Sequence, residues 1–295
     1  LCSRRILSLI RQSCGRGAPV GSRDVRRLSG IGDSGSLEVV QLIISGLSQG
    51  CVYGLIALGF VLIYKATEMV NFAQGDMMML GAFLAYTFSN LLELNFGVVI
   101  LLTFMSMAAL GAILERVALR PMLGEPPFAV LMLTIGLGFI LRAVAGAIWG
   151  NEPRALDTPF AGGVFRFGDL IVGYENLAIV VGTVLLCGVL FIFFKFTRLG
   201  IAMQAASQNQ LAAYYVGIPV KAIFAMVWAL SAVISATAGI LVAPVMLVDP
   251  LMGFIGVKAF AAAIVGGFGS LPGAIVGGLI VGLVEQFAGL YLPPG

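Results

Sequence analysis

The sequence predicts an all-α integral membrane protein, a polytopic bundle of about seven or eight transmembrane helices. Its 295 residues are 60% hydrophobic and 11% charged, with a mean hydropathy of +1.05, whereas about a quarter of the residues of a soluble domain are charged. Several runs without Asp, Glu, Lys or Arg reach the roughly 18 residues that a membrane-spanning helix needs. The chain lacks the regular ten-residue alternating segments of a membrane barrel, so helices rather than strands are indicated.

The apolar runs place the predicted spans in order along the chain. The long charge-free runs are Val39–Tyr64, Leu94–Leu114, Asn176–Phe194, Ala222–Val248 and Ala259–Val284. Two further runs, Met77–Leu92 and Phe128–Trp149, are shorter or contain one charge. The last long run contains Gly266, Gly267 and Pro272, which predict a helix broken near residues 256–273, as transporter helices are near binding sites.

The N-terminal segment differs from the rest in charge. Residues 1–32 hold seven Arg against one acidic residue, Asp24, whereas residues 33–295 hold ten basic and thirteen acidic side chains. We predict that residues 1–36 form a basic leader, disordered or mis-annotated, and that residues 37–295 form one transmembrane domain. An organellar transit peptide stays open as an alternative, because the leader is rich in Arg and Ser and has no apolar core.

Several kinds of chemistry are excluded by residue usage. The chain has no His, which removes His-based metal sites and His acid-base catalysis. Its four cysteines form no C-x-x-C pair, and no G-x-x-x-x-G-K-[ST] phosphate-binding motif occurs. We therefore expect no catalytic residue, no cofactor, no metal site and no nucleic-acid partner; the protein is not expected to be an enzyme.

A polar motif, Asn71-Phe-Ala-Gln-Gly-Asp76, joins two apolar runs. If it lies within the bilayer, its backbone groups must line a polar cavity or meet protein partners. Asn71, Gln74, Gly75 and Asp76 are then candidates to line a solute path, with Gly75 permitting unusual backbone angles. The alternative is a cytoplasmic turn in which Asp76 caps the next helix.

Arg142 is the one charge within the run Phe128–Trp149, about two turns before its end. An ionisable residue inside a span is a functional candidate, but Arg side chains also extend along the helix to reach the membrane interface. The position of Arg142 favours this second interpretation.

The segment 197–219 is polar and Ala-rich, lies between two long apolar runs, and closes with Gly217 and Pro219. A short helix outside the bilayer suits the docking of a soluble ATPase; the alternative is an ordinary surface helix that connects two spans. Basic residues in short loops favour the cytoplasmic face. When alternate loops are assigned to the same side of the membrane, the side that holds this segment has six basic residues: Lys65, Arg116, Arg120, Lys195, Arg198 and Lys221. The other face has three, Arg154, Arg166 and Lys258. The candidate coupling residues are Gly200, Ala205, Ala206, Ser207, Asn209 and Gly217.

Glycines recur every four residues near the C-terminal end. Residues four apart share a helix face, and glycines on such a face let two helix backbones approach closely. We predict helix packing by these glycines, with a direct role in the solute path as the alternative. They are Gly269, Gly273, Gly277, Gly278 and Gly282.

Taken together, several ordered segments resemble one known family, the inner-membrane permease subunits of bacterial branched-chain amino-acid ABC importers, of the LivH type. The resemblance covers about residues 37–292. The segments are Gly46-Leu-x-x-Gly50, Tyr53–Tyr64, Asn71–Asp76, Glu115–Pro121, Thr134-Ile-Gly136, residues 197–218 and Ala259–Ala274.

The resemblance implies partners and a location. The partners are a second homologous permease subunit, two ABC ATPase subunits, a periplasmic solute-binding protein and membrane lipid; the location is the bacterial inner membrane, with multiple passes. It also implies that residues 197–218 couple the ATPase. Gln74 stands where this family often has His, and the family usually continues with one more span, so the chain is expected to be truncated at its C-terminus.

We therefore predict a permease subunit of an ABC importer for branched-chain amino acids, driven by separate ATPase subunits. A sister permease for urea or short amides stays open, because substrate choice rests largely with the binding protein. The alternative from another class is a stand-alone secondary transporter, which would place ionisable groups at mid-membrane.

Overall fold

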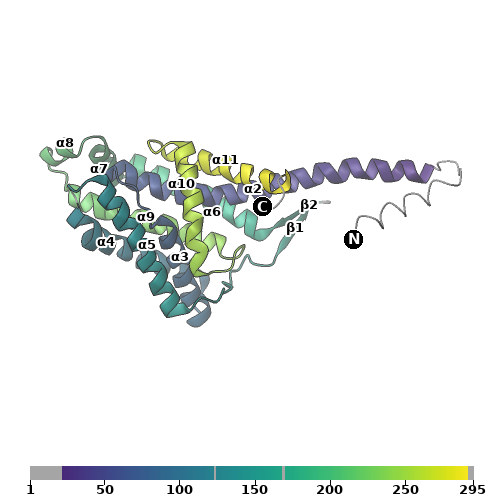
Figure 1. Cartoon of the computed structure of the whole chain (residues 1–295), viewed down its shortest axis with the longest axis horizontal. Coiled ribbons are helices and arrows are strands. Elements are labelled where there is room, and N and C mark those ends of the chain that lie inside the picture. Colours follow the sequence, from purple (N-terminus) through teal and green to yellow (C-terminus); the bar gives the residue numbers. More distant parts are fainter. Residues whose placement is uncertain (1–21, 123, 168–169, 292–295) are drawn as a thin grey trace, which may run out of the picture. The chain divides into compact units, whose positions relative to one another are not determined.

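A computed structural model describes residues 22–122, 124–167 and 170–291 (Figure 1). The chain divides into two units, residues 1–40 and 41–295. The first helix of the described residues, α2, spans Ser22–Thr67 and so begins within the predicted leader. The rest of that leader, residues 1–21, lies outside the described residues, and its interpretation stays a prediction. All the features below belong to the second unit.

The second unit consists of helices joined by short connections. After α2 come α3 (Gln74–Tyr86), the π-helix η1 (Thr87–Leu91), α4 (Phe96–Leu114), η2 (Glu115–Leu119), η3 (Arg120–Met122) and α5 (Pro127–Trp149). The second half contains β1 (Val164–Phe167), β2 (Leu170–Gly173), α6 (Tyr174–Phe196), α7 (Arg198–Gln208), α8 (Gln210–Tyr215), α9 (Val220–Val242), η4 (Pro250–Phe254), α10 (Ile255–Gly266) and α11 (Leu271–Tyr291).

The predicted class, an all-α multi-pass membrane protein, is confirmed. Among the described residues, six helices are long and apolar enough to cross a membrane, and Pro250–Gly266 forms a shorter apolar helix. α3 with η1 is also short. The spans lie at Val39–Thr67, Phe96–Met122, Pro127–Trp149, Tyr174–Phe196, Val220–Val242 and Leu271–Leu290.

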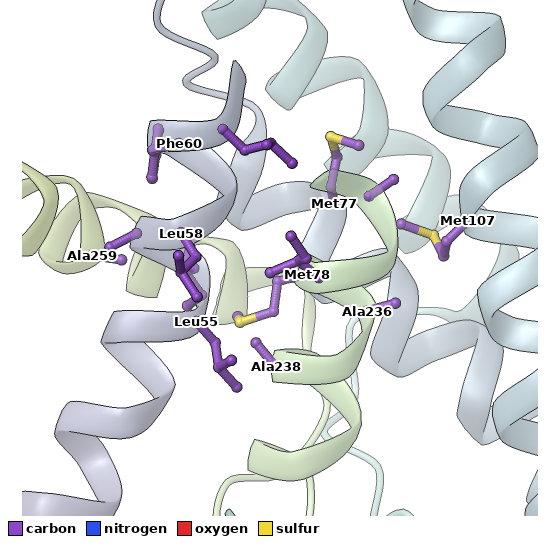
Figure 2. Packing of buried hydrophobic residues seen from close by; sticks show 14 of the residues in the cluster. Leu55, Leu58, Phe60, Met77, Met78, Met107, Ala236, Ala238 and Ala259 are labelled. Atoms are coloured by element: carbon purple, nitrogen blue, oxygen red, sulfur yellow. The ribbon is translucent and has the colours of Figure 1, made fainter. Parts of the chain in front are cut away.

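Two spanning helices form the centre of the bundle. In α2, 89% of the most apolar window is buried, and in α9 67%, against 22–33% in the other four. α9 packs along both α3 and α4, and Met77 and Met78 of α3 lie between it and α2 (Figure 2). The peripheral helices expose large apolar side chains; in a membrane protein such faces meet lipid or a partner subunit.

The long connection 151–175 contains a short antiparallel hairpin of β1 and β2 in which Val164 pairs with Gly173. A second bridge joins Arg154 to Val248. One residue of the orientation count is misplaced: Lys258 lies within α10 rather than in a loop, and its Nζ is 2.6 Å from Oε1 of Glu285.

The predicted break in the last apolar run is confirmed. α10 ends at Gly266, residues 267–270 turn, and α11 begins at Leu271. Gly267 has φ +83°, a left-handed conformation that glycine adopts without strain. The turn lets α11 fold back against α10.

Four of the five glycines predicted for packing face another backbone. A Cβ at Gly278 or Gly282 would lie 2.7 Å from the carbonyl oxygen of Gly50 or Gly46 in α2. A Cβ at Gly277 would lie 2.6 Å from the amide nitrogen of Gly266, and one at Gly273 would collide with the Gly266 carbonyl. The close approach of α11 to α2 and α10 therefore requires glycine, which has no side chain, at these four positions.

The fifth glycine does not fit the prediction. Gly269 lies in the turn 267–270 rather than on a helix face, and a Cβ there would meet nothing within 4 Å. Its spacing of four from Gly273 has no structural meaning, because the helix begins only at Leu271.

Replacing Gly278 with Val is expected to force α2 and α11 apart and to destabilise the protein by about 1–3 kcal/mol or more, as overpacking does in a close-packed interior. Thermal unfolding of the purified protein in mild detergent measures the effect. Gly188→Val is the matched control, since Gly188 in α6 has open space around its Cβ position. Equal losses of melting temperature in both variants would contradict this packing.

Candidate functional site

The motif between α2 and α3 is irregular backbone buried within the bundle. α2 ends at Thr67 and Glu68 adopts φ +56°, which turns the chain out of the helix. The amide of Phe72 donates to Oγ1 of Thr134 in α5 at 3.3 Å. Buried backbone outside a helix requires such partners in an apolar bundle, so Thr134 supports the loop from outside its own segment.

Asn71 and Gln74 are fully buried and belong to a hydrogen-bond network inside the protein. Asn71 Oδ1 accepts from the amide of Ala73 at 3.1 Å. Gln74 Nε2 donates to Oγ of Ser231 at 2.9 Å and to Oγ of Ser235 at 2.6 Å, both in α9. These bonds fix α3 against α9. The two amides are structural and do not line the pockets described below.

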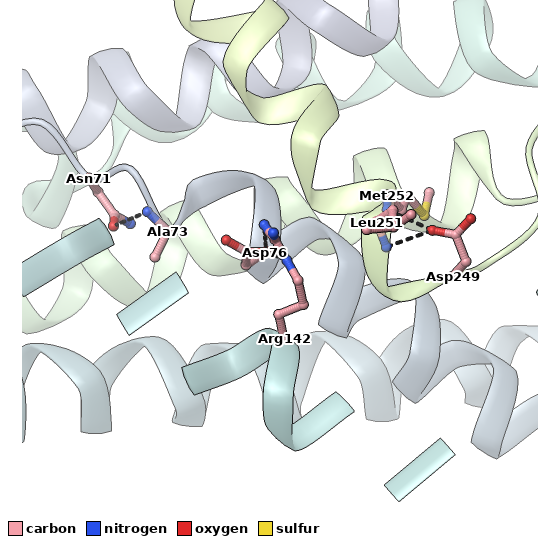
Figure 3. Close-up of polar contacts among 7 residues, drawn as sticks. All are labelled: Asn71, Ala73, Asp76, Arg142, Asp249, Leu251 and Met252. Atoms are coloured by element: carbon pink, nitrogen blue, oxygen red, sulfur yellow. Dashed lines mark hydrogen bonds and ion pairs between the residues drawn. The ribbon is translucent and has the colours of Figure 1, made fainter. Parts of the chain in front are cut away.

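Asp76 makes a different contact, an ion pair with Arg142 (Figure 3). Nη2 and Nε of Arg142 in α5 lie 2.8 and 3.2 Å from Oδ1 of Asp76 in α3. The side chain of Asp76 is 7% exposed and that of Arg142 is 19% exposed. The guanidinium also lies over the ring of Phe254, with Cζ 4.2 Å from the ring centroid.

This contact corrects two expectations. Arg142 pairs inside the bundle, because its head group lies against the buried carboxylate of Asp76 in α3. Asp76 is not a helix cap, because α3 begins at Gln74 with Ala73 at the cap position, and no side chain caps it.

Glycines make the room for this pair. A Cβ at Gly138 of α5 would lie 2.5 Å from Oδ2 of Asp76, and one at Gly253 of η4 would collide with Oδ1. Gly75 and Gly256 bring α3 and α10 together, since a Cβ on Gly256 would lie 2.7 Å from Cα of Gly75. Gly75 is therefore a packing residue, and its close approach sets Asp76 beside η4.

Two adjoining pockets meet at the ion pair. The inner pocket, of about 140 Å³, is bounded by Asp76, Arg142 and mostly apolar side chains. The outer pocket, of about 650 Å³, is bounded by Arg142, Asn151, Asp249 and neighbouring residues. Arg142 and Phe139 line both pockets. The apolar part of the inner lining consists of Phe60, Phe72, Ile135, Phe139, Phe254 and Val257.

Among the four residues predicted for the solute path, then, Asp76 alone lines an open pocket. Asn71, Gln74 and Gly75 hold it in place. Sequence analysis undervalued Arg142. Buried charges are normally paired. The signal in the sequence was that Arg142, the only charge in its apolar run, is opposite in sign to Asp76 of the polar motif.

The predicted coupling segment forms two helices rather than one stretch. α7 ends at Gln208, and Asn209 is extended, with φ −155°, while its Oδ1 accepts from the amide of Ala212 to cap α8. Gly217 follows α8 with φ +89°. Gln210 Nε2 donates to the carbonyl of Ala66 at 3.2 Å, which ties α8 to the end of α2.

The six predicted coupling residues differ in exposure. Ala205, Asn209 and Gly217 are exposed and Ser207 is half-buried. Gly200 and Ala206 are buried, and a Cβ at Gly200 would lie 2.7 Å from Cα of Phe194 in α6. These two residues pack α7 onto the bundle and offer no surface to a partner. The residues that sequence analysis missed are the exposed apolar side chains Leu211, Tyr214, Tyr215 and Val216.

Comparison with known proteins gives the family. Residues 42–294 match the family described as branched-chain amino acid transport system / permease component. The chain belongs to this permease family. The match covers every residue that lines the inner pocket and the whole α7–α8 segment, so both are parts of the permease component.

Individual relatives agree over most of the permease. It is 32% identical to the high-affinity branched-chain amino acid transport system permease protein BraD of Pseudomonas aeruginosa, over 84% of this chain and 85% of that protein. This chain is 30% identical to the permease protein LivH of Escherichia coli K12, over 87% of this chain and 88% of that protein. It is 33% identical to a probable LivH of Methanocaldococcus jannaschii, over 81% of this chain and 77% of that protein. No solved structure gives a significant match.

Replacing Gln74 with Leu is expected to destabilise the permease by about 1–3 kcal/mol, because hydroxyls in α9 then lose a buried partner. Thermal unfolding in detergent measures this. Ser235→Ala is the milder control, since Gln74 keeps its bond to Ser231 in that variant. A Gln74→Leu protein as stable as the unchanged one would show that the network contributes nothing to the fold.

Proposed function

We propose that this protein is the membrane-spanning permease subunit of an ABC importer for branched-chain amino acids in a bacterial inner membrane. The observation that carries the proposal is the family match over residues 42–294, joined by relatives that are named for this transport. ATP hydrolysis is assigned to separate subunits. The working domain is residues 37–295, and residues 197–219 form its ATPase-coupling segment.

The inner pocket supports a solute path. Its wall residues Phe139, Phe254 and Val257 are exposed, so the pocket opens at the surface of the chain. A charged pair facing lipid would be costly. We propose that a second, related permease subunit covers this face, so that the path runs between the two subunits.

The α7–α8 segment supports the docking of an ABC ATPase. Tyr215 and Val216 are each 82% exposed, and Leu211 and Tyr214 are 69% and 68% exposed. Exposed aromatic and aliphatic side chains gathered on one short segment mark a protein interface. The basic residues of the neighbouring loops support a cytoplasmic position for the segment, where the ATPase would meet it. A periplasmic solute-binding protein would deliver solute to the other face.

The stand-alone secondary transporter would need ionisable groups in the membrane that titrate or bind ions. Asp76 and Arg142 are ionisable, but they neutralise each other in one ion pair. No observation favours urea or a short amide over an amino acid at the family level, and the named relatives favour the amino acid.

Replacing Tyr215 and Val216 together with Asp is expected to abolish solute-stimulated ATP hydrolysis while leaving insertion and folding intact, because both side chains point away from the bundle. ATPase activity of the purified assembly measures this. Val164→Asp is the matched control: it changes an exposed apolar residue of the β1–β2 hairpin, which the charge pattern places on the opposite face. Unchanged stimulation in the double variant would remove the docking assignment.

The assembly is tested by isolating the tagged protein from its native host in mild detergent and identifying what comes with it. We expect a second permease, a P-loop ATPase and, after reconstitution with the binding protein, ATP-dependent uptake of labelled leucine. Recovery of the chain alone, or as a self-oligomer that takes up solute without ATP, would instead support the secondary transporter.

A further inference from the structure

The ion pair of the inner pocket is incompletely satisfied by the protein itself. Both hydrogen bonds from Arg142 end on the same oxygen, Oδ1 of Asp76. Within the described part of the chain, Oδ2 of Asp76 and Nη1 of Arg142 have no hydrogen-bond partner. A packed structural pair normally satisfies its remaining lone pairs and protons with further bonds, as Gln74 does with two hydroxyls of α9. The pair therefore has one acceptor and one donor that can bind a ligand.

The surroundings of the pair match one class of solute. Its walls are otherwise apolar, with four phenylalanine rings, an isoleucine and a valine around one carboxylate and one guanidinium. A ligand that fits this lining carries a positive group, a negative group and a hydrocarbon body. A guanidinium binds a carboxylate through two parallel hydrogen bonds, and a carboxylate accepts from an ammonium. An amino acid with an aliphatic side chain has all three parts on adjacent carbons.

Arg142 also stands where the two pockets meet. It lines both the inner and the outer pocket, as does Phe139. Its side chain holds Asp76 and covers the ring of Phe254 at the same time. Displacement of the guanidinium from Oδ1 therefore moves one of the two side chains that line both pockets.

We propose that the Asp76–Arg142 pair recognises the zwitterionic head group of the solute and opens to admit it. Asp76 accepts from the α-ammonium and Arg142 donates to the α-carboxylate, while the phenylalanines contact the side chain. This inference rests on the proposed function and names the contacts of its solute path.

Exchange of partners explains why a zwitterion, in particular, opens the pair. Separation of two buried charges is costly when either is left unpaired. A zwitterion supplies a new partner for each charge in the same step, so neither becomes uncompensated. An uncharged solute such as urea offers dipoles only and leaves the closed ion pair as the more stable arrangement.

The decisive variant is Asp76→Asn combined with Arg142→Gln. It removes both charges, so no buried charge is left unpaired, and it keeps a polar amide group at each position. The reconstituted assembly with its binding protein is assayed for ATP-dependent uptake of labelled leucine. We expect uptake to fall about tenfold or more, the scale set by the loss of charge-assisted hydrogen bonds, while melting temperature and subunit recovery stay unchanged.

A matched control neutralises an ion pair away from the pockets. Arg120 Nη2 lies 3.1 Å from Oε2 of Glu115 at the end of the α4 region, so Glu115→Gln with Arg120→Gln removes the same number of charges. That control is expected to retain uptake. Each single change at Asp76 or Arg142 is expected to impair both folding and uptake.

The outcomes separate the two proposals. Uptake by the Asp76→Asn, Arg142→Gln variant within about twofold of the unchanged protein would show a purely structural pair and overturn the inference. An unchanged assembly that takes up no leucine would overturn the proposed function and the inference with it. If the neutral variant does not assemble, Arg142→Lys decides: it keeps the charge pair but loses the planar fork, so stable protein with several-fold slower uptake is expected, and undiminished uptake overturns the inference.

Discussion

The fold depends on satisfying polar groups inside a bundle that has almost no water to offer them. Between α2 and α3 the chain leaves the helix while still buried, carrying an asparagine, a glutamine and an aspartate into the apolar interior. Each unmet backbone or side-chain group there would cost several kcal/mol in an apolar medium. The neighbouring helices supply the partners: Thr134 meets the loop backbone, Ser231 and Ser235 meet Gln74, and Arg142 meets Asp76. The positions of α5 and α9 around α3 follow from these contacts.

The apolar environment of the membrane also favours helices whose backbones approach closely. Helices in a membrane gain little from hydrophobic exclusion between one another, so they pack through contact area and hydrogen bonds. Glycines allow α11 to lie on α2 and α10, and α10 to lie on α3. The contact between α3 and α10 also shapes the inner pocket, because it brings Gly253 and Phe254 of η4 beside the carboxylate of Asp76.

Much of this was predictable from sequence, for identifiable reasons. Composition fixed the membrane class, and Gly267 marked the break between α10 and α11. The direction of single side chains was not predictable: Asn71 and Asp76 sit in one short motif, yet one faces the core and the other a pocket. The partner of Asp76 is 66 residues away in another helix. The spacing of residues within one segment does not show which distant residue it contacts. Asn209 divides the coupling segment because its side chain caps α8, and Ala206 is buried by packing that an Ala-rich pattern cannot orient.

The docking segment and the pocket are joined by contacts within the second unit. α8 is bonded to the end of α2 through Gln210 and Ala66, immediately before the buried loop. α7 and α8 also pack against α9, the helix whose serines hold Gln74 two residues from Asp76. Displacement of α7–α8 by a bound ATPase would therefore shift both the end of α2, before the buried loop, and α9, which holds the start of α3. Because the interior is close-packed, that displacement cannot be absorbed locally. The ion pair has open space beside it in the inner pocket, so movement can be accommodated there.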